Sequence, residues 1–271
     1  MSPERLVTLA LAEDLGEGGD ITSALLVSPG RRATARVVAR RHGVLAGREA
    51  GEEVLRQTGV DGTWHAADGD RLEPGTVVAE IEGPARAVLA AERTLLNLLC
   101  HLSGVATLTA AYVAECGTVA VLDTRKTTPG MRALEKAAVR AGGGENHRMG
   151  LFDRVLVKDN HLALAGAALA AAVQRARREM PDVLVEVEAD DLDGVRRALD
   201  AGADWILLDN MSAETMRAAV ALVAGRARLE ASGGMSLAGA RAAAATGVDA
   251  VSVGALIHSA PALDLGLDID V

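Results

Sequence analysis

Residues 185–210, VEVEADDLDGVRRALDAGADWILLDN, decide the fold. Two short apolar runs end in Glu188 and Asp209, and the helical segment between them stops at Gly202, a residue type that often follows a last helical turn. Apolar runs of this length are typical of parallel strands buried on both faces. The stretch therefore predicts one strand–helix–strand unit of an α/β protein.

The same pattern recurs from about residue 115 onward. Ser212 is placed to cap one intervening helix and Gly247 to follow another. Recurrent units of this kind indicate either an α/β barrel or a doubly wound sheet, and in both folds ligands gather beyond the carboxyl ends of the strands. The predicted strands are VAVLD (119–123), RVLVK (154–158), VLVEVE (183–188), WILLD (205–209), RLEAS (228–232) and AVSVG (250–254).

Residues 1 to about 105 follow a different pattern. Short alternating runs separated by glycine-rich turns predict a mostly antiparallel sheet, with one helix at 47–58 and a long helix at about 84–114. The run ADGDRLEPGTVVAEIEG has some likeness to a biotinyl carrier hairpin, but no lysine precedes Lys126 to carry the cofactor. This part is therefore expected to be a separate α+β domain.

Composition excludes several classes of protein. A net charge of -9 and only four aromatic residues argue against a nucleic-acid partner. Cys100 and Cys116 lie in no CxxC or Cys/His cluster, which argues against disulfide scaffolds and structural zinc. The amino terminus lacks the basic start of a signal peptide, and the apolar run at 162–173 is too short to span a bilayer. A cytoplasmic location is expected.

A basic segment at 124–158 stands out in this acidic chain. It holds eight Arg or Lys residues against three acidic ones, and it contains all three lysines of the protein. Arginine grips planar carboxylates with two hydrogen bonds, whereas lysine binds phosphate as a point charge. We expect the cations in loops or at strand ends to bind small anions, namely Arg125, Lys126, His147, Arg148 and Lys158. Arg132, Lys136 and Arg140 are expected on a solvated helix face.

Carboxylates and glycines occupy the other strand ends. Glu188 and Asp209 can hold Mg²⁺ against a pyrophosphate, stabilise positive charge at a sugar carbon, or act as acid and base. The turns SGG (232–234) and VGA (253–255) offer backbone amides to a phosphate or serve only as tight turns. His161 and His258 could serve as acid–base groups, but each is expected to be a loop histidine that makes local hydrogen bonds.

Motifs along nearly the whole chain resemble those of quinolinate phosphoribosyltransferases. The longest of them, at 123–148, is highly specific. The motifs are LAEDLGEGGDITS (11–23), AERTLLNLLCHLSGVAT (91–107), DTRKTTPGMRALEKAAVRAGGGENHR (123–148), LVKDNH (156–161), VEVEADDL (185–192), ILLDN (206–210), SGG (232–234) and VGALIHS (253–259).

This resemblance implies an α/β fold, namely an incomplete TIM-like α/β barrel with an N-terminal α+β open sandwich domain. The domains are expected at 1–107 and 108–261, with a C-terminal tail of about 262–271 that returns to the first. It also implies a homodimer in which the N-terminal domain of one subunit caps the barrel of its partner, and Arg93 is expected to reach across that interface.

The resemblance further assigns site residues. Quinolinate is expected to contact Arg93, Arg125, His147, Arg148 and Lys158. Catalytic roles are implied for Lys126, Glu188 and Asp209, of which the two carboxylates are the expected Mg²⁺ ligands. Phosphoribosyl pyrophosphate (PRPP) is expected to contact Thr124, Lys126, Glu188, Asp209, Ser232, Gly233, Gly234, Val253, Gly254 and Ala255.

The implied activity is transfer of phosphoribose to quinolinate with loss of CO₂, giving nicotinate mononucleotide and pyrophosphate for NAD biosynthesis. No organic cofactor is expected. Three alternatives remain at this point. They are a related phosphoribosyl or ribosyl transferase that acts on another acid, a barrel aldolase that uses Lys158 as a Schiff-base nucleophile, and a non-catalytic phosphate-binding protein.

Overall fold

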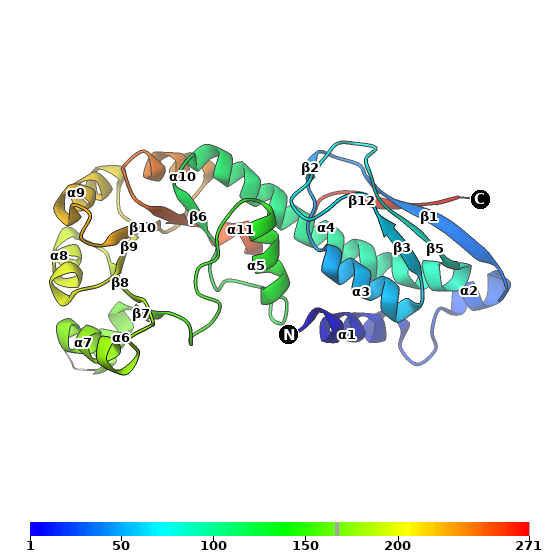
Figure 1. Ribbon diagram of the computed structural model, residues 1–271, viewed down its shortest axis with the longest axis horizontal. Helices are drawn as coiled ribbons and strands as arrows, with labels where there is room; N and C mark the ends of the chain where they lie inside the picture. Colours follow the sequence, from blue (N-terminus) through cyan, green and yellow to red (C-terminus); the bar gives the residue numbers. More distant parts are fainter. Residues whose placement is uncertain (166–167, 271) are drawn as a thin grey trace. The chain divides into compact units, whose positions relative to one another are not determined.

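The computed structural model describes residues 1–165 and 168–270, and the chain divides into two compact units (Figure 1). The first unit comprises Met1–Ala110, Thr127–Gly143 and the chain from Leu256 onward, and the second comprises Ala111–Lys126 and Gly144–Ala255. The segment Thr127–Gly143, which the sequence places in the domain 108–261, thus belongs to the first unit. Val271, the end of the expected tail, lies outside the described residues.

An antiparallel sheet forms the centre of the first unit. Its strands are β12 (Leu265–Asp270), β1 (Arg32–Ala39), β5 (Val77–Pro84) and β3 (Asp61–Trp64), in that order across the sheet, so the last described residues pair with β1. The remaining elements are α1 (Pro3–Leu15), α2 (Ile21–Leu26), β2 (Gly43–Val44), α3 (Arg48–Thr58), β4 (Arg71–Leu72), α4 (Ala85–Cys116) and α5 (Arg132–Ala141).

Strand alternation explains this sheet. In β5, Ala79 and Ile81 are buried whereas Glu80 and Glu82 are exposed, as expected for side chains that alternate between a core and solvent. The core includes Leu95, Leu99 and Leu102 of α4, none of which is exposed. Helix α4 is also long and apolar enough to cross a membrane, but 61% of its most apolar window is buried, as in the core helix of a folded domain.

A parallel six-stranded sheet forms the second unit and confirms all six predicted strands. Its order across the sheet is β6 (Ala120–Leu122), β11 (Ala250–Ser252), β10 (Arg228–Ser232), β9 (Trp205–Asp209), β8 (Val185–Ala189) and β7 (Val155–Val157). Helices connect the strands, as Figure 1 shows for α8 and α9 beside β8 and β9. They are α6 (Asp159–Ala165), α7 (Leu169–Glu179), α8 (Leu192–Ala201), α9 (Ala213–Val223) and α10 (Leu237–Ala244), and the short α11 (Ala255–His258) follows β11.

The predicted helix signals are confirmed. The side chain of Ser212 accepts a hydrogen bond from the Thr215 amide at 3.1 Å and caps α9. Gly202 has φ of +84° directly after α8, a left-handed conformation that glycine adopts without steric cost. These signals fix where each helix starts and stops, and hence where the next strand begins.

The strand order is that of an incomplete barrel. Strands β6 and β7 would be neighbours in a closed barrel, but here they form the two edges of the sheet. The chain between β6 and β7 passes beside β6, where Glu145 forms a single parallel β-bridge with Leu122. The Glu145 amide donates to the Val121 carbonyl at 2.8 Å. This pairing sets the position of His147, two residues later.

One expectation about α5 is wrong. Lys136, which the sequence places on a solvated face with Arg132 and Arg140, has no exposed surface. The adjacent Glu135 is also fully buried, and it accepts hydrogen bonds from His101 at 2.9 Å and from the Thr128 amide at 2.9 Å. The spacing of charged residues along this helix therefore does not show which of its faces is exposed to solvent.

Candidate active site

Parallel strands bring their polar side chains to one edge of the second unit. Because side chains alternate along a strand, Glu186 and Glu188 share one face of β8, and Glu230 and Ser232 share one face of β10. Ser232 is in register with Asp209 on the neighbouring strand β9. The carboxyl ends of the sheet therefore assemble residues that are far apart in the sequence.

A cavity of about 350 Å³ opens among these residues, within the second unit. It brings together most of the anion-binding residues that the sequence predicts. Its lining consists of Thr124, Arg125, Lys126, His147, Arg148, Leu156, Lys158, Glu188, Leu207, Asp209, Glu230, Ser232 and Ser252.

Some predicted site residues lie elsewhere. Arg93 belongs to α4 in the first unit, where its side chain is 61% exposed and lies 3.4 Å from a carboxylate oxygen of Glu92. Gly233 and Gly234 line another cavity, of about 270 Å³, together with Asn210. Val253, Gly254 and Ala255 follow β11 without lining the first cavity.

The first unit contains a hollow of similar size, about 380 Å³, on its antiparallel sheet. Two charged residues of this hollow pair with each other, since Arg36 lies 2.8 Å from Asp270. In the second unit, by contrast, the carboxyl ends of several parallel strands bring cationic and acidic side chains together in one cavity. The cavity among the parallel strand ends is thus the better candidate for an active site.

The open rim of this cavity carries opposite charges. The Lys158 ammonium forms an ion pair with Glu188. The Lys158 side chain is 40% exposed and the Glu188 side chain is 17% exposed. Asp209 accepts a hydrogen bond of 2.8 Å from the side-chain amide of Asn210. An ion-paired ammonium lacks the free electron pair that a Schiff base requires, which argues against the aldolase alternative.

Two residues that directly follow the rim strands, Asn210 after β9 and Gly233 after β10, lie close together. Asn210 has φ of +52°, unusual for a residue with a side chain, and its amide donates to the Ser232 carbonyl at 2.9 Å. Gly233 has φ of +105°, and a Cβ there would lie 2.2 Å from Oδ1 of Asn210. Glycine is therefore required at 233 both by its backbone angle and by close approach to Asn210.

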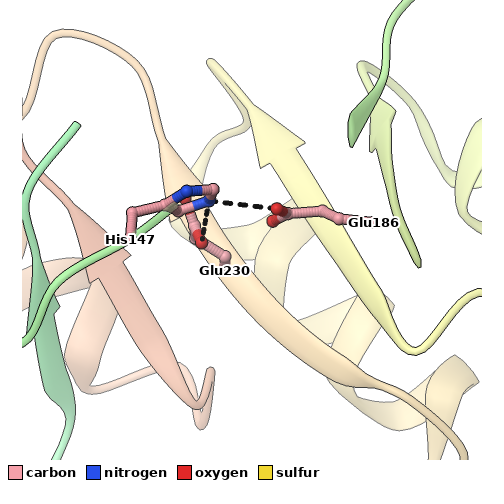
Figure 2. Close-up of side chains that lie close together, drawn as sticks. All are labelled: His147, Glu186 and Glu230. Atoms are coloured by element: carbon pink, nitrogen blue, oxygen red, sulfur yellow. Dashed lines mark hydrogen bonds and ion pairs between the residues drawn. The ribbon is translucent and has the colours of Figure 1, made fainter. Parts of the chain in front are cut away.

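The inner end of the cavity holds a buried cluster of His147, Glu186 and Glu230 (Figure 2). Nε2 of His147 lies 3.0 Å from a carboxylate oxygen of Glu186 and 3.4 Å from one of Glu230. Both glutamate side chains are at most 1% exposed. The amide of His147 donates to buried Asp123 at 3.0 Å, which fixes the start of the loop that carries the histidine.

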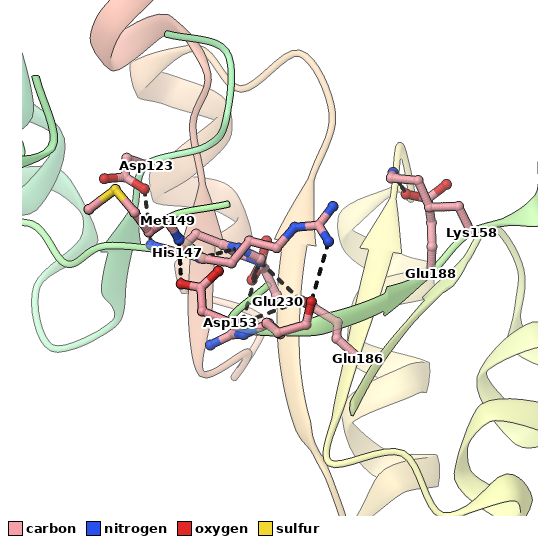
Figure 3. A network of polar contacts seen from close by, with 10 residues as sticks. Asp123, His147, Met149, Asp153, Lys158, Glu186, Glu188 and Glu230 are labelled. Carbon is pink, nitrogen blue, oxygen red and sulfur yellow. Dashed lines mark hydrogen bonds and ion pairs between the residues drawn. The ribbon is translucent and has the colours of Figure 1, made fainter. Parts of the chain in front are cut away.

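Arginines surround this cluster. Nη1 of Arg154 lies 3.3 Å from Oε2 of Glu186. The guanidinium of Arg154 also stacks over the Trp205 ring, with its central carbon 5.4 Å from the ring centre. The Arg148 amide donates to Nδ1 of His147 at 2.7 Å, and its guanidinium donates to the Arg154 carbonyl at 3.4 Å. In Figure 3 the Lys158–Glu188 pair stands apart from the network around His147.

The two buried glutamates have opposite pKa shifts. Burial alone would raise the pKa of Glu186, but hydrogen bonds and charge from His147 and Arg154 outweigh it, so its pKa is lowered. Burial, together with the charge of Glu186, keeps the pKa of Glu230 raised despite the hydrogen bond to His147. The surroundings of Glu186 thus favour its charged form, and those of Glu230 favour its protonated form.

Glu186, Glu230 and Arg154 are not among the site residues that the sequence predicts. A signal for the glutamates was present, because each is a charged residue inside an apolar strand and lies two positions before a rim residue, Glu188 or Ser232. Side chains two apart on a strand point to the same side. No comparable signal marks Arg154, whose place depends on the path of loop 147–154.

Comparisons with known proteins point to one family over nearly the whole chain. Residues 20–103 and 105–268 match the models of the N-terminal and C-terminal domains of quinolinate phosphoribosyl transferase. Nicotinate-nucleotide pyrophosphorylase (carboxylating) of Mycobacterium leprae is 46% identical, over 96% of this chain and 94% of that protein. A probable enzyme of the same name from Bacillus subtilis is 41% identical, over 98% and 93%. The solved structure of the nicotinate-nucleotide pyrophosphorylase from Francisella tularensis superposes with a TM-score of 0.93 at 39% identity, covering 99% of this chain and 96% of that one.

Proposed function

Because the chain belongs to the quinolinate phosphoribosyltransferase family and is a carboxylating nicotinate-nucleotide pyrophosphorylase of NAD biosynthesis, we propose that the strand-end cavity of its second unit carries out the reaction. The observation that supports this most is the composition of its lining, which combines four cations from 125–158 with carboxylates from three neighbouring strands. A dianionic acid and a pyrophosphate ester need both kinds of group.

Quinolinate would occupy the cationic part of the cavity. Arg125, Arg148 and Lys158 neutralise its two adjacent carboxylates, and His147 belongs to the same wall. Fixing both carboxylates leaves the ring nitrogen as the free nucleophile and aims it at C1 of the ribose. Burial and the nearby charge of Arg125 lower the pKa of Arg148, which indicates a site where cations are crowded before an anion arrives.

PRPP would occupy the rim. Thr124, Lys126 and Ser232 line the cavity there. The turns at 233–234 and 253–255 do not line it, but they directly follow β10 and β11 and would offer further backbone amides to the phosphates. Glu188 and Asp209 offer carboxylate oxygens from neighbouring strands, the donor type that Mg²⁺ prefers, and Asp209 is oriented by Asn210. Bound there with the pyrophosphate, Mg²⁺ would supply charge neutralisation for the leaving group.

The bond changes then follow from the placement of the substrates. The ring nitrogen forms a bond to C1 while the C1–oxygen bond to pyrophosphate breaks, with Lys126 beside the leaving group. Negative charge from Glu188 and Asp209 stabilises the positive character of the sugar carbon. The ribosylated nitrogen is an electron sink, so the adjacent C2 carboxylate leaves as CO₂ and C2 takes a proton.

Metal dependence and Asp209 test this assignment together. Purified protein incubated with quinolinate and PRPP is expected to form nicotinate mononucleotide only when Mg²⁺ is present. Asp209→Asn should lower the rate by about a hundredfold or more, because an amide is a weaker Mg²⁺ ligand and carries no charge. Full activity in the presence of a chelator, or an unaffected Asp209→Asn enzyme, would contradict the rim assignment.

We further propose a homodimer in which Arg93 completes the quinolinate site of the partner. An exposed arginine on a helix of the first unit, with only Glu92 as an ion-pair partner in the described residues, supports this role. Mixing inactive Arg93→Ala subunits with inactive Arg148→Ala subunits should restore about a quarter of the active sites, because each mixed dimer contains one site with neither change. If Arg93 serves its own subunit, mixing restores nothing.

The enzyme is proposed to act in the cytoplasm. Both cysteines, Cys100 and Cys116, are free thiols in the structure, and burial raises the pKa of each. Unpaired, unreactive thiols suit a reducing compartment.

A further inference from the structure

The turn that follows β10 contains two consecutive glycines in left-handed conformations. Gly233 has φ of +105° and Gly234 has φ of +51°. Glycine gives a chain segment more conformational freedom than any other residue, so such a turn does not hold one shape by itself. Both glycines also line the cavity of about 270 Å³, so there is space beside the turn into which it could move. Amides of this turn can therefore bind a phosphate well only if other parts of the protein hold the turn in place.

Two hydrogen bonds hold the turn, one on each side of the glycine pair. Before the pair, the Ser232 carbonyl accepts the backbone amide of Asn210 at 2.9 Å. After the pair, the Met235 carbonyl accepts the hydroxyl of Tyr112 at 2.9 Å. The next residue, Ser236, caps α10, so the chain beyond the turn is fixed as well. The first of the two hydrogen bonds joins backbone groups, whereas the second depends on one side chain.

Tyr112 is suited to hold a carbonyl. It is the only tyrosine of the chain, it lies near the end of α4, and it belongs to the second unit together with Met235. The residue is 5% exposed, and burial raises the pKa of its phenol above the ordinary value. The hydroxyl therefore keeps its proton at neutral pH and remains a donor. A buried ring has little freedom to turn away, so the carbonyl that it binds stays in one place.

We propose that Tyr112 is a positioning residue for PRPP. Its hydroxyl holds the Met235 carbonyl and thereby keeps the amides of Gly233 and Gly234 in the arrangement that a phosphate group of PRPP meets. Tyr112 does not line the strand-end cavity, so it acts through the turn and not by contact with the substrate. This inference rests on the proposed role of the turn in PRPP binding.

Tyr112→Phe tests the role, because it removes the hydroxyl and keeps the buried ring. The Met235 carbonyl then loses its hydrogen bond, and the glycine turn samples shapes that do not fit a phosphate. The KM for PRPP should rise about five- to tenfold with kcat nearly unchanged, since a contact made by both the bound substrate and the transition state is weakened. The KM for quinolinate should change less than about twofold. Steady-state rates at saturating Mg²⁺ measure these values.

Glu115→Gln is the matched control. Glu115 lies one turn further along α4 and forms an ion pair with Arg241 of α10, so its loss loosens the same two helices without touching the glycine turn. The KM of this variant for PRPP should stay within about twofold of the wild-type value. An equal rise in both variants would mean that Tyr112 acts only through the packing of α4 on α10. That result, or an unchanged KM for PRPP in Tyr112→Phe, would overturn the inference.

Amide hydrogen exchange observes the turn without an enzymatic assay. In the ligand-free protein, the amides at 233–235 should exchange about fivefold faster in Tyr112→Phe than in the wild type, and at the wild-type rate in Glu115→Gln. Mg²⁺–PRPP should slow exchange of these amides in the wild type, whereas quinolinate alone should not. Exchange that is the same in Tyr112→Phe and in the wild type would show that the hydroxyl does not hold the turn.

The outcomes separate this inference from the proposed function. A wild-type protein that consumes PRPP, combined with a Tyr112→Phe variant of unchanged KM, rejects the positioning role alone. Failure of the wild-type protein to bind or consume PRPP would instead reject the proposed function, and the exchange rates of the ligand-free variants would still decide whether Tyr112 holds the turn.

Discussion

The two ends of the active-site cavity are built from the same strands but in different environments. Glu186 and Glu188 lie two residues apart on one face of β8, yet the Glu186 side chain has no exposed surface whereas that of Glu188 is 17% exposed. Glu186 contacts His147 and Arg154, both largely buried, whereas Glu188 contacts Lys158, which is 40% exposed. One strand thus supplies a fixed internal charge and an accessible one.

The difference shows how burial divides the work of like residues. A buried carboxylate must keep its partners, because a charge without a partner is costly inside a protein. A rim carboxylate can exchange Lys158 for Mg²⁺ or substrate, because solvent screens the charges while they rearrange. We therefore expect the inner cluster to serve shape and stability, and the rim to serve chemistry.

The largest expected effect on stability comes from replacing the buried glutamate of β8. Glu186→Ala should lower the free energy of unfolding by about 3 to 5 kcal/mol, because it leaves Arg154 and His147 without their buried partner. Glu188→Ala removes a partly exposed ion pair and should cost less than about 1 kcal/mol. Urea unfolding of the two variants measures both values.

The two variants should also differ in catalysis. Glu188→Ala is expected to keep the fold and lose most of its Mg²⁺-dependent activity. Equal destabilisation by the two changes would mean that the rim pair is as structural as the inner cluster, and would remove the distinction between the two ends.

A smaller effect is expected at the turn after β10. Gly233→Ala places a Cβ against Asn210 and adopts a left-handed φ, so it should cost about 2 to 3 kcal/mol and raise the KM for PRPP. Gly234→Ala is a matched control, because φ is +51° but no atom lies within 4 Å of the new Cβ, and it should cost only about 1 kcal/mol. If Gly234→Ala lowers the free energy of unfolding more than Gly233→Ala does, Asn210 does not constrain the turn.

The smallest expected effect concerns pH. Burial lowers the pKa of His147, but its hydrogen bonds to Glu186 and Glu230 raise that pKa more, to about 9, so the ring keeps one charge state between pH 6 and pH 8 and quinolinate affinity should change by less than about threefold there. Calorimetric titrations at several pH values measure it. A tenfold loss between pH 6 and pH 8 would show that a binding group titrates in this range, well below the pKa expected for His147, and the inner end would then resemble the rim.

The sequence predicted the framework of the second unit well. Each of the six strands was marked by an apolar run, and Ser212 and Gly202 marked helix ends, because these are local signals that depend on neighbouring residues only. The positions of Glu188, Asp209 and Ser232 at strand ends were predicted for the same reason, since a strand end is recognisable in the sequence, and their roles in binding stay a prediction.

What the sequence did not predict depends on contacts between distant segments. Glu186 and Glu230 look like ordinary strand residues until the sheet brings them to one histidine from a loop. Lys136 was expected in solvent because helical spacing gives the relative direction of side chains but not what covers them. Burial of a charge is decided by tertiary packing, and a single sequence carries little record of it.

The central claim is that the inner end binds the dicarboxylate and the rim binds the pyrophosphate ester. Calorimetric binding of each ligand alone to Arg148→Ala and to Asp209→Asn tests it most directly, with benzene-1,2-dicarboxylate as a quinolinate substitute that lacks the reactive nitrogen. Arg148→Ala should lose the dicarboxylate by about a hundredfold and keep Mg²⁺–PRPP, and Asp209→Asn should do the reverse. If each variant loses both ligands equally, the two ends do not divide the work and the account is wrong.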